Sequence, residues 1–340
     1  MRFGLFGGPA AGPDRAGFEH AYHRFADYAV LAEELGFASV FLTEHHFTGI
    51  GQASQPLTLL AHLAARTSRL RLGTAVTVLP WHDPLLLAEQ AATLDVLSNG
   101  RLDFGVGRGF RAAEFAGFVQ SMDEAAERYE EALAVILRGW TAQGRWSHHG
   151  RFWHYDDVLV EPATAQSPHP PVWVGAGSRP SLTAAADNGF KLLLDQVGSF
   201  ETTAERVATY RERVVENGGA YDPVTDVAVT RSLHLVDGPQ ERERAIRERV
   251  ELFAEVAKLT NDERGPRNRM AADYTSDIRA ATEAGAIIGD AEECVARLER
   301  LREGGVEYVL LIDRDNSPET LREFARTVMP RLAAEAQRLG

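Results

Sequence analysis

The sequence is poor in cysteine: Cys294 is the only one among 340 residues. A single thiol excludes a disulfide within the chain and is typical of proteins from a reducing compartment. Residues 1–6 are too few and too rich in glycine for a signal peptide. No apolar run approaches the length of a membrane span. We therefore expect a soluble, cytoplasmic protein.

Positive charge is also scarce. Lys and Arg total 36 against 49 Asp and Glu, which gives a net charge of −13. No basic cluster interrupts this acidic background, so nucleic acid and anionic membranes are not expected partners. Hydrophobic residues make up 44% of the chain, enough for a large core.

Two loops that carry common chemistries are missing. The sequence contains no Gly-x-x-x-x-Gly-Lys-Ser/Thr loop, which would cradle a nucleoside triphosphate. It also contains no Gly-x-Ser-x-Gly turn, which would carry the nucleophile of an α/β-hydrolase. These absences disfavour those two enzyme classes.

Short apolar runs alternate with helical patterns along the whole chain. Eight runs read as strands: 3–6, 38–42, 69–79, 102–109, 172–178, 191–195, 227–236 and 308–312. Eight strands alternating with helices predict one (β/α)₈ TIM barrel that forms a single domain over residues 1–340. A doubly wound open sheet is the alternative.

Two stretches depart from this alternation. Aromatic runs at 145–146 and 152–155, separated by His149 and Gly150, predict a small hairpin insertion. Residues 260–285 are charged and lack a sustained period. So long a stretch inside a barrel is typical of a lid over the site or of a disordered excursion before the last strand.

Charged and imidazole groups follow the second predicted strand directly, as Glu44, His45 and His46. Such groups are costly at the end of a buried strand unless they face a cavity or find partners. In a barrel this end opens into the mouth where active sites lie. Neighbouring residues on a strand point to opposite faces, so the two histidines are not expected to bind one metal ion.

The fourth and fifth strand ends suggest a phosphate site. Arg108 lies between glycines, and Gly175, Gly177 and Ser178 open a helix. Amides at a helix start, together with a hydroxyl and a guanidinium, bind phosphate well. By itself the glycine-serine segment would be only a tight turn with a capping serine. Arg108 on the adjacent strand end favours the phosphate interpretation.

These residues carry a family resemblance over the length of the chain. The segments 44–47, 84–90, 94–109 and 168–174, together with Ser178, resemble the bacterial luciferase-like family of flavin-dependent monooxygenases. The resemblance implies the same (β/α)₈ barrel, with FMN at the carboxyl ends of the strands.

The resemblance also implies roles for single residues. Arg108 and Ser178 would hold the FMN phosphate, with Ala176, Gly177 and Ser181 assisting. It also implies a non-proline cis peptide between Ala75 and Val76 beneath the flavin ring and His45 as acid or base, with Glu44 and His46 beside it. From the residue types alone, Phe6, Phe47, Trp81 and Phe110 suggest an apolar pocket, which His82 could line unless it lies on the loop surface.

The activity implied is that of a two-component monooxygenase. Reduced FMN from a separate NAD(P)H:flavin reductase would react with O₂ to form a flavin peroxide, which transfers one oxygen atom to a small apolar organic substrate. Two alternatives stay open: a hydride-transfer oxidoreductase that uses a deazaflavin coenzyme, and a flavin-binding protein without turnover. The family also implies a homodimer formed through the second and third helices.

Overall fold

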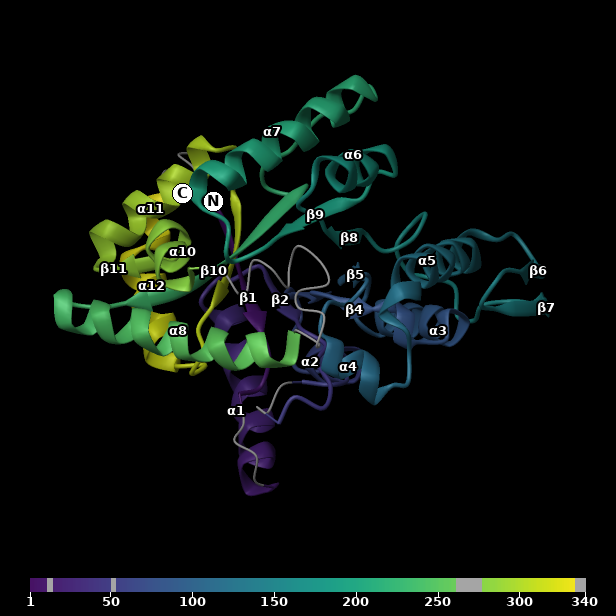
Figure 1. The fold of residues 1–340 in the computed structure, drawn as a ribbon, viewed down its shortest axis with the longest axis horizontal. Helices are drawn as coiled ribbons and strands as arrows, with labels where there is room; N and C mark the ends of the chain where they lie inside the picture. Colours follow the sequence, from purple (N-terminus) through teal and green to yellow (C-terminus); the bar gives the residue numbers. More distant parts are fainter. Residues whose placement is uncertain (11–14, 50–52, 261–276, 334–340) are drawn as a thin grey trace.

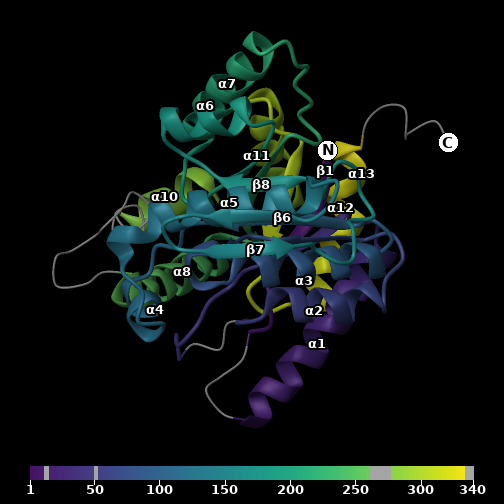
Figure 2. The ribbon, with the colours of Figure 1, turned by 90° about the vertical axis from the view of Figure 1, so that its right-hand side faces the viewer.

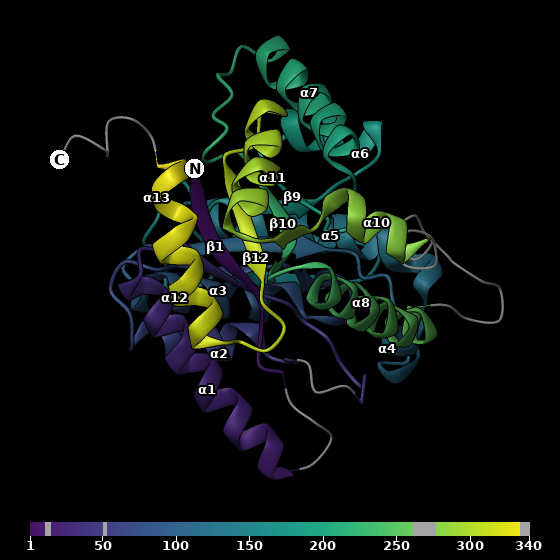
Figure 3. The same cartoon turned by 90° about the vertical axis from the view of Figure 1, so that its left-hand side faces the viewer.

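Eight parallel strands form a closed barrel in the computed structural model, which describes residues 1–10, 15–49, 53–260 and 277–333. Each strand pairs in parallel with its neighbour around the ring, and β1 closes it against β12 (Figure 3). The strands in order around the barrel are β1 (Arg2–Gly7), β2 (Ser39–Leu42), β3 (Arg71–Thr74) with β4 (Thr77–Val78), β5 (Leu102–Gly107), β8 (Val172–Gly175), β9 (Lys191–Leu194), β10 (Val227–Leu235) and β12 (Tyr308–Ile312). The predicted barrel is confirmed.

Helices surround these strands (Figure 1). Several begin where the sequence supplies a cap, as at α3, where the Asp83 carboxylate accepts hydrogen bonds from the amides of Leu85 and Leu86. The helices are α1 (Arg15–Glu34), α2 (Pro56–Ala64), α3 (Pro84–Leu97), α4 (Ala112–Gly117), α5 (Ala125–Thr141), α6 (Arg179–Asp187), α7 (Phe200–Glu216), α8 (Pro239–Thr260), α10 (Ile278–Gly285), α11 (Ala291–Glu303), α12 (Pro318–Thr327) and α13 (Met329–Leu332), with 3₁₀ turns η1 (Leu79–Trp81) and η2 (Met122–Glu124).

The third predicted strand, 69–79, is split in two. The peptide between Ala75 and Val76 is cis, as predicted, and it separates β3 from β4. Beside the break, Thr74 Oγ1 donates to the carbonyl of Gly105 on β5 at 2.6 Å. A Cβ atom on Gly105 would lie 1.7 Å from the carbonyl oxygen of Thr74. Only glycine therefore allows β3 and β5 to approach so closely here.

The predicted hairpin insertion is confirmed. Strands β6 (Trp146–His149) and β7 (His154–Val158) pair in antiparallel fashion and lie outside the barrel, beside α5 and α3 (Figure 2). The Glu131 carboxylate on α5 anchors the hairpin turn, because it accepts hydrogen bonds from the backbone amides of Arg151, Phe152 and Trp153.

The prediction of an irregular stretch at 260–285 was wrong at its ends. Thr260 completes α8, and residues 278–285 form the regular helix α10, which packs against α8. A short strand, β11 (Ile287–Gly289), follows and pairs with the last three residues of β10. Residues 261–276 lie outside the described part, and the expectation of a lid rests on them.

The barrel interior is filled by aromatic and aliphatic side chains. Phe41, Trp173 and Tyr308 meet edge to face there, with ring centres 5.6 to 6.4 Å apart. Phe6, Ala75 and Val76 are only partly buried and pack on this cluster. They therefore form the floor of the mouth. No helix in the described ranges has the length and apolar character needed to span a membrane.

Candidate active site at the barrel mouth

The predicted site residues gather at the carboxyl ends of neighbouring strands. Residues 44–46 follow β2, and the cis peptide follows β3. Arg108 follows β5, and the segment 176–181 follows β8, which is the hydrogen-bonded neighbour of β5. The structure thus brings both halves of the predicted site to one face of the barrel.

His45 is held by a carboxylate that sequence reasoning did not single out. Its Nδ1 lies 3.0 Å from Oε1 of Glu114, which comes from α4. A carboxylate accepts, so Nδ1 carries the hydrogen of this bond. Burial lowers the pKa of His45, and the charge of Arg111 lowers it further, while Glu114 opposes both. The lowered pKa favours the neutral imidazole near pH 7, in which Nε2 carries a lone pair.

Glu44 holds two other histidines. Its Oε1 lies 3.0 Å from Nε2 of His46 and 2.7 Å from Nε2 of His82, and its Oε2 accepts the amide of Val78 at 2.8 Å. Burial alone would raise the pKa of Glu44, but these hydrogen bonds bring it below its ordinary value. Glu44 is thus a buried anion that fixes His46 and His82.

Aromatic rings enclose His46. Its imidazole meets Phe118 at 4.8 Å and Trp81 at 5.5 Å between ring centres, both nearly edge to face, and Phe47 at 5.8 Å. His46 is 8% exposed, and its Nε2 is occupied by Glu44. This environment suits a packing and orienting role better than contact with a substrate.

The start of α6 presents donors that converge on one point. The amides of Gly177 and Ser178 lie 3.3 and 3.1 Å from Oγ of Ser181, whose amide donates in turn to Oγ of Ser178. Both serines thus form a capping box at an exposed helix start. Donors of this kind suit a phosphate too, since a helix start favours negative charge.

Arg108 supplies the positive charge beside this helix start. It is exposed and makes no hydrogen bond or ion pair with any residue that the structure describes. Burial raises the pKa of Tyr129 on α5 to about 12, and the charge of Arg108 opposes that rise, so the phenol and guanidinium are near each other. Tyr129 is a second candidate donor at this place.

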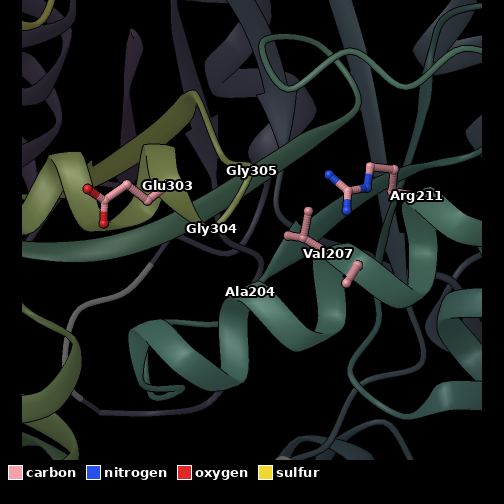
Figure 4. Close-up of a pocket in the computed structure, with 7 residues that line it drawn as sticks. Ala204, Val207, Arg211, Glu303, Gly304 and Gly305 are labelled. Carbon is pink, nitrogen blue, oxygen red and sulfur yellow. The ribbon is translucent and has the colours of Figure 1, made fainter.

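A cavity of about 210 Å³ lies away from the mouth, between α7 and the end of α11 (Figure 4). Gly304 and Gly305 line it, and they precede the start of β12. The cavity is therefore near the amino ends of the strands, opposite the predicted site. Ala204 and Val207 supply much of its opposite wall. None of the predicted site residues lines it.

Comparison with known proteins decides the family. The family model described as luciferase-like monooxygenase matches residues 1–308. The chain belongs to the luciferase-like monooxygenase family.

Relatives within this family are diverse. The oxygenase component of a flavin-dependent trigonelline monooxygenase from Acinetobacter baylyi is 27% identical over 345 residues, covering 97% of this chain and 95% of that protein. Two uncharacterised proteins from Sinorhizobium fredii are 36% identical, but the match spans only about half of their length.

Solved structures agree with the fold. The monooxygenase RslO1 from Streptomyces bottropensis superposes with a TM-score of 0.83 at 28% identity, covering 98% of this chain and 100% of that one. An FMN complex of 3,6-diketocamphane monooxygenase from Pseudomonas putida reaches 0.76 at 18% identity, covering 98% and 99%. An F420-dependent secondary alcohol dehydrogenase reaches 0.77 at 17%, again covering 98% and 99%. These last two show the barrel alone.

Three residues of this luciferase-like site escaped sequence reasoning: Arg111, Glu114 and Tyr129. Glu114 is only 2% exposed, which is rare for a carboxylate. No pattern in the sequence indicates that it is buried. The segment 112–117 is too short for a periodic signal. Among the described residues, no three His, Cys, Asp or Glu side chains gather as metal ligands would.

Proposed function

We propose that this luciferase-like protein is the oxygenase component of a two-component, FMN-dependent monooxygenase. It would take reduced FMN from a separate NAD(P)H:flavin reductase and insert one oxygen atom of O₂ into a small apolar organic substrate. One observation carries the proposal: a histidine hydrogen-bonded to a buried carboxylate and a helix start with converging amide donors share one barrel mouth.

The residues at the helix start fit a flavin phosphate. The amides of Gly177 and Ser178 already point at a single oxygen atom, Oγ of Ser181. Arg108, without a partner among the described residues, adds the countercharge from the adjacent strand end. We assign phosphate binding to these four residues, with Ala176 in the same turn and Tyr129 nearby.

The floor of the mouth suits a flat apolar ring. Phe6, Ala75 and Val76 are partly buried there, on top of the interior aromatic cluster. An isoalloxazine ring resting on them would lie between the phosphate end and His45. Bound reduced flavin supplies the activation of O₂, which the side chains of this chain do not provide.

His45 would act on the substrate side of the flavin. Its side chain is 13% exposed, and its Nε2 has no partner among the described residues. Phe110 lies edge-on to it, with ring centres 6.4 Å apart, and makes this part of the mouth apolar. We assign to His45 the transfer of a proton at Nε2, and to Glu44 the fixing of His46 and His82 behind it.

Hydride transfer with a deazaflavin coenzyme is the second candidate. The fold permits it, since an F420-dependent secondary alcohol dehydrogenase shares this barrel at 17% identity. Binding of both FMN and a deazaflavin coenzyme therefore has to be measured. Preferential binding of the deazaflavin over FMN would favour this second candidate.

We also propose a homodimer that covers α2 and α3. The exposed side of α3 carries Leu86, Val96 and Leu97, which are 55%, 43% and 64% exposed. A helix that is apolar on all its faces usually packs against something on each of them. A second copy of the chain would cover this surface.

Two alanine variants test the assignment of the two ends of the site. We expect Arg108→Ala to weaken binding of FMN about tenfold to a hundredfold, because a charge-assisted phosphate contact contributes roughly 1.5–3 kcal/mol. We expect His45→Ala to leave that affinity within about twofold and to slow oxygen transfer. Equilibrium binding by fluorescence quenching measures the first effect. Equal loss of FMN affinity in both variants would show that the roles are misassigned.

A further inference from the structure

Arg111 is a buried arginine whose charge acts on His45 but to which the proposed function gives no role. It is 3% exposed and directly precedes α4. Its Nη1 lies 3.7 Å from Oε1 of Glu114, and its Cζ lies 5.6 Å from the centre of the Phe110 ring. Taking a guanidinium out of water is costly unless a carboxylate compensates its charge.

The compensating oxygen is shared. Oε1 of Glu114 is also the atom that faces Nδ1 of His45 at 3.0 Å and accepts the amide of His46 at 2.9 Å. One carboxylate carries one negative charge, and the guanidinium of Arg111 already balances it. A protonated His45 would add a second positive charge to a nearly dry cluster.

Within the described part of the chain, the other carboxylate that acts on His45 has no unoccupied oxygen for that second charge. Glu44 is the other carboxylate that acts on His45, and its two oxygens are taken by His46, His82 and the Val78 amide. The Phe110 ring on the remaining side is uncharged. The cluster thus stabilises the neutral imidazole.

We propose that Arg111 is a positioning residue that balances the negative charge of Glu114. His45 is then held in one neutral form, with hydrogen on Nδ1 and an accepting lone pair on Nε2. This inference rests on the proposed function, in which His45 transfers a proton. It decides between the two roles left open above: His45 starts the reaction as a base, not as an acid. The proton that Nε2 accepts from the substrate returns to solvent after turnover.

Imidazole NMR of the flavin-free protein tests this inference without any activity. The protein is labelled with ¹⁵N-histidine, and His45 is assigned by comparison with a His45→Asn variant. The ¹⁵N shifts report which nitrogen carries hydrogen, and a pH titration reports proton binding. The variants are Arg111→Met, which removes the charge, and Arg111→Lys, which keeps it.

We expect wild-type His45 to be mainly the neutral Nδ1–H form at pH 7 and above. In Arg111→Met, His45 should bind a proton at least about tenfold more tightly, so the midpoint of its titration should rise by about one pH unit. Arg111→Lys should restore most of the wild-type titration. Unchanged titration in Arg111→Met, or equal shifts in both variants, would overturn the proposal. An arginine with only a structural role would not change the titration of either imidazole nitrogen.

A second variant keeps the proposal testable if Arg111→Met does not fold. Glu114→Gln removes the carboxylate and leaves the guanidinium, so His45 should bind a proton less tightly than in the wild type. Tighter or unchanged binding would contradict the inference. Failure of the monooxygenase proposal would leave these titrations as predicted, whereas failure of the Arg111 proposal would leave oxygen transfer intact.

Discussion

The Glu44→Gln substitution tests how much the buried charge of Glu44 contributes to the stability of the folded protein. The Glu44 side chain is completely buried and receives three hydrogen bonds, from His46, His82 and the amide of Val78. Glutamine keeps one acceptor oxygen and turns the other into an NH₂ group. If the remaining oxygen faces the two imidazoles, the NH₂ group meets the Val78 N–H.

The magnitude follows from these contacts. An unpaired buried amide costs about 1–3 kcal/mol, and each imidazole bond loses about 1 kcal/mol when its acceptor becomes neutral. Removing the buried charge returns part of its desolvation cost. We expect a net loss of about 3 kcal/mol in the free energy of unfolding, measured by urea denaturation followed by circular dichroism at pH 7.

Glu33→Gln is the matched control. The Glu33 carboxylate also accepts three backbone amides, those of Ser68, Arg69 and Leu70, but it lies near the surface. Because solvent screens this carboxylate, we expect its replacement to cost only about 1 kcal/mol or less. A loss in Glu44→Gln no larger than in Glu33→Gln would refute the reasoning about burial.

Two further predictions concern pH and assembly. Burial lowers the pKa of His234 from 6.5 to about 4, so the unfolded chain binds its proton first and stability falls as pH drops from about 6.5 to 4. His234→Gln should reduce the difference in unfolding free energy between pH 7 and pH 4 by about 3 kcal/mol; the same pH dependence as the parent chain would contradict this. Leu97→Glu on the exposed side of α3 should convert the proposed dimer to a monomer in sedimentation velocity, whereas a monomeric parent would refute the dimer itself.

The barrel was predictable because its strands are continuous apolar runs. Segments such as 39–42 and 308–312 are buried on both faces, and a parallel sheet covered by helices needs such runs. The split of the third strand was expected only through the family resemblance. Composition alone gives Ala75 and Val76 no mark of a cis peptide.

Elements that depend on distant partners were missed. Strand β11 has three residues and exists because β10 extends past the barrel rim to pair with it. Helix α10 was hidden in a charged stretch, although an Asp277 cap and a buried Ile278 face begin it. Neither feature has a local pattern long enough to distinguish it from a loop.

The site was predictable in its residue types and not in its contacts. The sequence placed His45 and Arg108 at strand ends, which is where the structure has them. The partner of His45 is Glu114, 69 residues away along the chain. Such a pair is created by the sheet, since β2 and β5 lie on either side of β3 and end at the same edge.

Reaction of the protein-bound reduced FMN with O₂ tests the central claim most directly. In stopped-flow mixing, we expect the oxidised-flavin absorbance to return only after a lag, much later than for free reduced FMN, and the lag to disappear in Arg108→Ala as binding is lost. Reoxidation as fast as that of free reduced FMN, at protein concentrations that bind all the flavin, would contradict the account.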